Sequence, residues 1–61
     1  MSEREIIELA AILVNEHGRA ALAVAERRRD QHPQHSASFR LWSKIAGATA
    51  RLLRVQLREE A

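Results

Sequence analysis

Two of the three histidines lie close together, at a spacing that a small metal site could use. His32 and His35 follow Asp30 in a short polar stretch, and Pro33 stiffens the segment between them. One such loop supplies at most three ligands, whereas structural zinc sites are almost always four-coordinate. Short histidine-containing loops are common on plain surfaces. We therefore expect a solvated turn here and no bound metal.

The third histidine, His17, lies within an apolar helical pattern. We expect it to be buried or at an interface, hydrogen-bonded to Thr49 or to a backbone carbonyl. A pH-sensitive interface and a ligand contact are the alternatives, because histidine titrates near neutral pH.

The chain lacks the residues of a catalytic centre. It has no cysteine, its two glycines form no phosphate-binding loop, and its acidic residues fall on polar faces or near the chain ends. Two helices also offer no deep cleft. We expect neither enzymatic activity nor a cofactor.

Basic residues form one stripe on the second predicted helix. They are Arg40, Lys44, Arg51, Arg54 and Arg58. Arginine stays charged and binds anions bidentately. Such a stripe is typical of a solvated outer face. The alternatives are contact with a nucleic-acid backbone or with an acidic protein surface. No aromatic residue is interleaved with the stripe, which disfavours stacking on single-stranded bases.

Three further arginines, residues 27–29, precede the polar loop, where cations complement the negative end of a helix. Phosphate or acidic-partner contact is the alternative. The only two aromatic residues are Phe39 and Trp42. We expect both to anchor a core or an interface, because tryptophan is a frequent interface hot spot.

Helical periodicity runs through most of the chain. Ser2 and Glu5 have the spacing of a capping box, and Ser36 or Ser38 can cap a second helix. We predict helices over about 3–29 and 37–59, joined by a loop over 30–36. Gly18 is a possible helix end, but a helical pattern resumes directly after it. We therefore expect a continuous or mildly kinked first helix.

These elements predict an all-α fold, an antiparallel two-helix hairpin in a single domain. The chain has 61 residues, of which 46% are hydrophobic. A core of this size is marginal without a staple. We therefore expect self-association or a partner to complete a four-helix bundle. The residues expected at the interface are Leu13, His17, Leu41, Trp42, Ile45, Leu52 and Leu53.

The hydropathy of the chain indicates its surroundings. No uncharged run approaches the roughly 20 apolar residues that span a bilayer. The first residues lack the basic start of a secretory signal. We expect a cytoplasmic protein without a membrane span, and attachment to a lipid surface is a weaker alternative.

The segments 11–18, 25–27 and 41–46, with Ala21, resemble a group of small proteobacterial proteins. These share an apolar helix ending in His-Gly, an Ala-Glu-Arg segment and a tryptophan in a second helix, and they are known as a domain of unknown function. The resemblance implies a bacterial source and a helical hairpin, but no activity. The loop around His32-Pro33 departs from the more apolar, glycine-containing connection of that group, and the basic tail is longer.

Two functions are consistent with these patterns. The first is a non-enzymatic module for helical interaction or oligomerisation, either as a homodimer or docked on a larger protein. The alternative is a small basic regulator that binds nucleic acid through the second-helix stripe.

Overall fold

The computed structural model describes the backbone of residues 1–60 and the side chains of residues 1–56. Helix α1 spans Glu3–His17, a 3-10 turn η1 spans Gly18–Ala20, α2 spans Ala21–Asp30 and α3 spans Ala37–Glu60. No strand occurs among these residues. The predicted all-helical class is confirmed.

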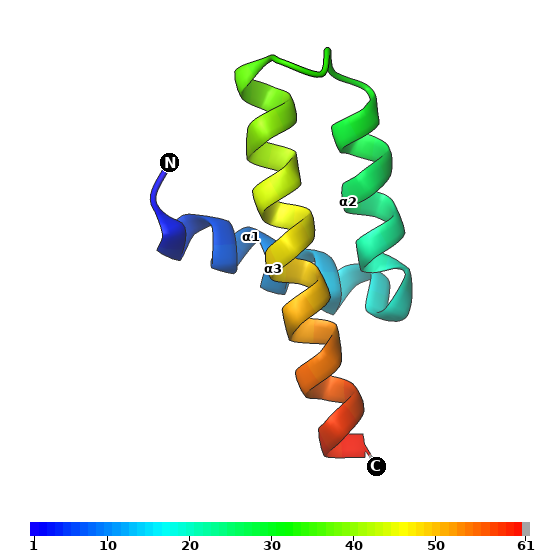
Figure 1. The fold of residues 1–61 in the computed structure, drawn as a ribbon. Coiled ribbons are helices and arrows are strands. Elements are labelled where there is room, and N and C mark those ends of the chain that lie inside the picture. The colour runs from blue at the N-terminus through cyan, green and yellow to red at the C-terminus, as the bar shows by residue number, and fades with distance from the viewer. Residues whose placement is uncertain (61) are drawn as a thin grey trace.

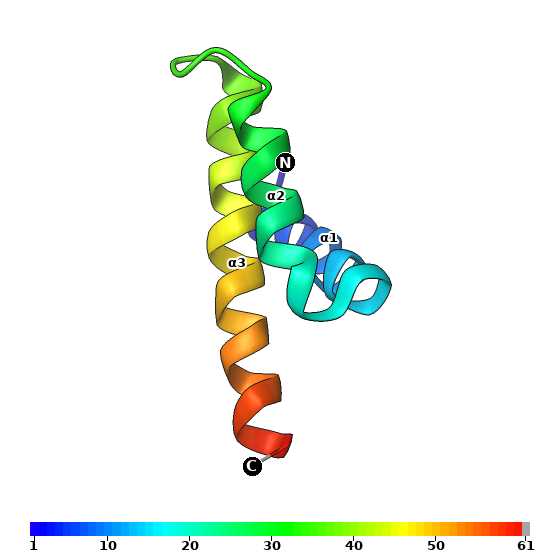
Figure 2. The same cartoon turned by 90° about the vertical axis from the view of Figure 1, so that its right-hand side faces the viewer.

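Helices α2 and α3 lie side by side and antiparallel, joined by residues 31–36 (Figure 1). Helix α1 lies across α3 rather than along it, as both views show (Figure 2). The C-terminal part of α3 extends past the other two helices. The hairpin is therefore formed by α2 and α3, and α1 is a third helix packed across it.

The continuous or mildly kinked helix that we expected over 3–29 is instead divided at Gly18 into two helices joined by a 3-10 turn. This residue has φ 57° and ψ −130°, and its N–H donates to the carbonyl oxygen of Val14. A side chain is strained at such a positive φ, so glycine is the residue that accepts it. The break turns the chain between α1 and α2 and allows α1 to cross α3.

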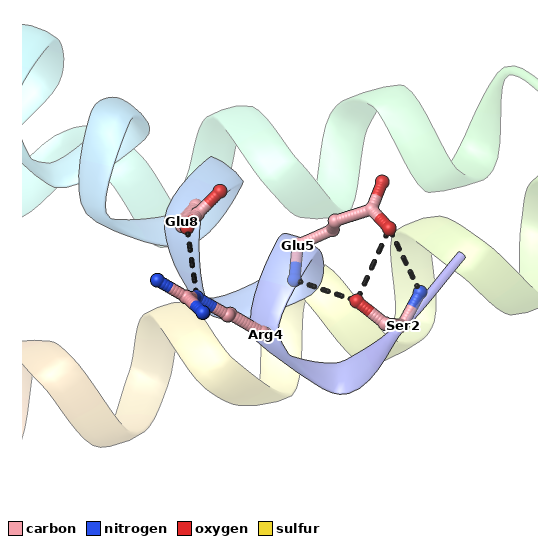
Figure 3. Close-up of polar contacts among 4 residues, drawn as sticks. All are labelled: Ser2, Arg4, Glu5 and Glu8. Atoms are coloured by element: carbon pink, nitrogen blue, oxygen red, sulfur yellow. Dashed lines mark hydrogen bonds and ion pairs between the residues drawn. The ribbon is translucent and has the colours of Figure 1, made fainter.

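The N-terminus of α1 has the predicted capping box (Figure 3). The Glu5 N–H donates to Ser2 Oγ at 3.3 Å, and the Ser2 N–H donates to Glu5 Oε1 at 3.4 Å. These bonds satisfy donors that have no partner within the helix. An exposed ion pair between Arg4 and Glu8, at 3.4 Å, lies on the same turn.

The start of α3 is set by Ser36 and not by Ser38. The Phe39 N–H donates to Ser36 Oγ at 3.1 Å, and this hydroxyl donates to the carbonyl oxygen of Pro33 at 2.7 Å. The same side chain therefore caps the helix and fastens it to the preceding loop.

The core lies where α1 and α2 meet α3. Its larger side chains are Ile6, Leu13, Val14, Ile45 and Thr49. The other buried positions are all alanines, namely Ala10, Ala21, Ala25, Ala46 and Ala48. Small side chains let helices approach closely but bury little apolar surface. No helix among the described residues is long and apolar enough to cross a membrane.

Candidate interaction surfaces

The residues that we expected at an interface are divided by the structure between core and margin. Leu13 and Ile45 are buried within the chain's own core, so they are not available to a partner. A second group is partly buried and packs against that core, and its members are Leu41, Trp42, Leu52 and Leu53. Ile45, which we expected to contact a partner, is therefore covered by the chain's own α1 and α2.

His17 is not buried within the chain, and the expected hydrogen bond to Thr49 is wrong, whereas its place at an interface stays a prediction. It is the last residue of α1, and its side chain is exposed. Its Nε2 lies 3.8 Å from Glu16 Oε2, whereas the Thr49 hydroxyl donates to the carbonyl oxygen of Ile45. The physical reason is the break at Gly18, which turns α1 away from the path along α3 that would have brought His17 to Thr49.

Two of the exposed large apolar side chains, Ile7 and Val55, meet in the angle between α1 and the C-terminal part of α3, where they border buried core residues. We call this surface the apolar corner, and it comprises Ile7, Ala11, Val14, Ala48, Leu52 and Val55. Two open grooves of about 180 and 270 Å³ lie here, and both are lined by Leu52 and Val55. Ile7 is 44% exposed and Val55 is 53% exposed. The corner is concave and accessible, and polar side chains border its apolar residues, namely Glu3, Asn15, Arg51 and Gln56.

Sequence reasoning missed Ile7 and Val55 as candidates. Both lie beside the buried stripes of their helices, so each helix alone indicates only a wide apolar face. It is the crossing of α1 over α3 that brings the two side chains into one groove. The sequence does show that the apolar face of each helix is wide. It does not show which part of that face the other helices cover.

Each of the two aromatic rings is in cation–π contact with an arginine of α2. The guanidinium of Arg28 lies 5.4 Å from the centre of the Trp42 ring, and that of Arg29 lies 5.8 Å from the centre of the Phe39 ring. Arg29 Nε also donates to Asp30 Oδ1 at 3.0 Å, and this hydrogen bond raises the pKa of Arg29. Two of the three loop-proximal arginines therefore help to join α2 to α3.

The basic stripe borders a larger groove on the other side of α1's first turn. We call it the basic groove. It measures about 570 Å³ and is lined by Lys44, Gly47, Arg51 and Arg54 of α3, with Met1, Glu3 and Ile6 opposite. Arg40 is exposed one turn before Lys44. Arg58 lies outside the residues whose side chains are described.

The loop histidines gain no further ligands from the fold. Among the described residues, no three histidine, cysteine or acidic side chains gather closely enough to hold a metal ion. His35 is exposed and His32 is partly buried.

Comparisons with family models, with curated proteins and with solved structures find no match to this chain.

Proposed function

We propose that this chain is a non-enzymatic helical interaction module that self-associates through the apolar corner. The observation that carries the proposal is the meeting of Ile7, Leu52 and Val55 in one open, concave surface. Apolar side chains that meet in an accessible groove with a polar border are typical of interaction sites, unlike apolar side chains scattered singly over a surface. Half of the buried positions in the core are alanines, so the chain has a particular need for further apolar burial.

The arrangement that fits this surface is a twofold pair. The C-terminal parts of the two α3 helices lie side by side near Val55, and each fills the corner of the other copy. A twofold interface uses the same patch on both copies and therefore closes at a dimer. Helices α1 and α3 of the two copies then form a four-helix arrangement around one apolar centre.

Charge supports the choice of a second copy as the occupant. Helix α1 contains four glutamates and one arginine, whereas the basic residues from Arg40 to Arg54 have no acidic residue among them. In the proposed pair, α3 of one copy lies against α1 of the other. Opposite charges then border the apolar contact, which favours correct pairing over other orientations.

Sedimentation equilibrium across the micromolar range tests this proposal. We expect the wild-type chain to be dimeric and Val55→Glu to be monomeric. Burial of a valine side chain contributes about 1.5–3 kcal/mol, so its replacement by a charge weakens association by at least about tenfold. Val55 is half-exposed in the single chain, so the variant retains its helical circular dichroism.

Ile12→Glu is the matched control. Ile12 is 52% exposed, close to the 53% of Val55, but it does not line either groove of the corner. This variant should remain dimeric. A folded wild-type monomer throughout the range, or equal loss of association in both variants, would contradict the proposal.

A further inference from the structure

The basic groove concentrates positive charge along one side of α3. Lys44, Arg51 and Arg54 line it, and none of the three forms an ion pair with another described side chain. Lys44 and Arg54 are ten residues apart, so the groove follows α3 for about 15 Å. Arg40 extends the same stripe by one turn.

Gly47 forms the floor of this groove between the charged residues. A glycine inside a helix lowers helix stability relative to alanine. Internal packing does not require it here, because a Cβ at this position would meet no atom within 4 Å. The missing side chain instead leaves the α3 backbone open to a molecule that approaches from outside.

From these observations we propose that the basic groove binds the phosphate groups of a duplex nucleic-acid backbone. A duplex carries one negative charge per about 1.7 Å of its axis, so a stretch of about 15 Å presents several phosphates to the stripe. Guanidinium groups bind phosphate oxygens bidentately, and the lysine adds a point charge.

The groove contacts the backbone and not the bases. Trp42 and Phe39 are held under Arg28 and Arg29 of α2, and neither aromatic ring lines the groove. Without an aromatic platform, single-stranded bases have nothing to stack on. The binding is therefore independent of sequence and governed by charge. DNA and RNA duplexes share this chemistry, and both are tested.

Fluorescence anisotropy with 20-base-pair DNA and RNA duplexes, measured over a salt series, tests the proposal. Three groove contacts predict a slope of log affinity against log salt of about −2.7, because each phosphate contact contributes about −0.9. We expect Lys44→Gln and Arg54→Gln each to reduce the steepness by about one unit. Arg27→Gln removes the same charge from α2, outside the groove, and should leave the slope unchanged.

A variant that keeps the net charge separates the shape of the groove from bulk charge. Gly47→Leu keeps the net charge but fills the floor, and we expect it to weaken binding at least fivefold, while Ala23→Leu on the exposed face of α2 has no effect. Glu3→Gln removes the carboxylate opposite the cations and should strengthen binding.

The proposal is overturned if Gly47→Leu binds as the wild type does, or if Arg27→Gln lowers the slope as much as Arg54→Gln. Tighter binding of poly-glutamate than of either duplex would assign the groove to an acidic protein and also overturn it. Lys44 and Arg54 do not line either groove of the apolar corner, and sedimentation of the two variants separates a loss of duplex binding from a loss of the dimer.

Discussion

The hydroxyl of Thr49 donates a hydrogen bond of 2.7 Å to the carbonyl oxygen of Ile45, one turn earlier in α3, and both side chains are fully buried. A buried hydroxyl requires a partner, and here its own helix supplies one. No buried side-chain polar atom among the described residues is left unsatisfied. The polar residue in the core therefore needs neither His17 nor a bound group.

Thr49→Val should change the free energy of unfolding by less than about 1 kcal/mol, because valine keeps the shape and Ile45 O retains its helical bond. Urea denaturation followed by circular dichroism measures the effect. A loss above about 2 kcal/mol would mean that the hydroxyl has another partner, since an abandoned buried partner costs about 1–3 kcal/mol.

Replacing each glycine by alanine should give effects of opposite sign. Gly18→Ala should destabilise the fold by about 1–3 kcal/mol, because Gly18 has a positive φ that strains any side chain. Gly47→Ala should stabilise it by up to about 1 kcal/mol, because alanine is the better helix former and space is free. Thermal unfolding of both variants provides the measurement. If Gly18→Ala were stabilising, the first helix would be continuous and α1 would not cross α3.

Ser36→Ala should cost about 1 kcal/mol through loss of the α3 cap. Ser38→Ala is the internal comparison, since Ser38 is exposed in the first turn and has no such bond among the described residues. We expect the Ser38 variant to lie within about 0.5 kcal/mol of wild type in the same urea experiment. Equal losses would indicate that the helix begins elsewhere.

Arg28→Gln should destabilise the hairpin by about 0.5–1 kcal/mol, because a cation over a tryptophan face contributes about this much at an exposed site. Trp42 is the only tryptophan, so its fluorescence reports directly on this contact. Arg27→Gln removes the same charge without a described ring contact and should leave the emission unchanged. A similar spectral change in both variants would refute the specific stacking.

Local signals in the sequence predicted local structure well. The Ser2–Glu5 spacing specifies a capping box, and the serines after Pro33 mark the start of a helix. In both cases the decisive partners are three residues apart. These features depend on hydrogen bonds between near neighbours in the sequence, so they could be predicted without knowledge of the tertiary contacts.

The path of the chain at Gly18 was not predictable in this way. Alanine-rich helical pattern on both sides favours a continuous helix, and a glycine within a helix costs only about 1 kcal/mol. The break is favoured because it brings Ile6 and Ala10 of α1 into the same core cluster as Ile45 and Ala48 of α3. That gain depends on tertiary contacts, which periodicity within one helix does not contain. The same misjudged path placed His17 opposite Thr49 and gave no reason to expect Ile7 and Val55 in one groove.

Disulfide trapping measures the central proposal, association through the apolar corner, most directly. The chain has no cysteine, so single substitutions give an unambiguous readout. Val55→Cys and Ile12→Cys place thiols at positions of nearly equal exposure, 53% and 52%, inside and outside the corner. Under mild oxidation, the account predicts rapid covalent dimerisation of Val55→Cys, with Ile12→Cys reacting only at the slow rate of random collisions. Equal rates in the two variants would contradict it.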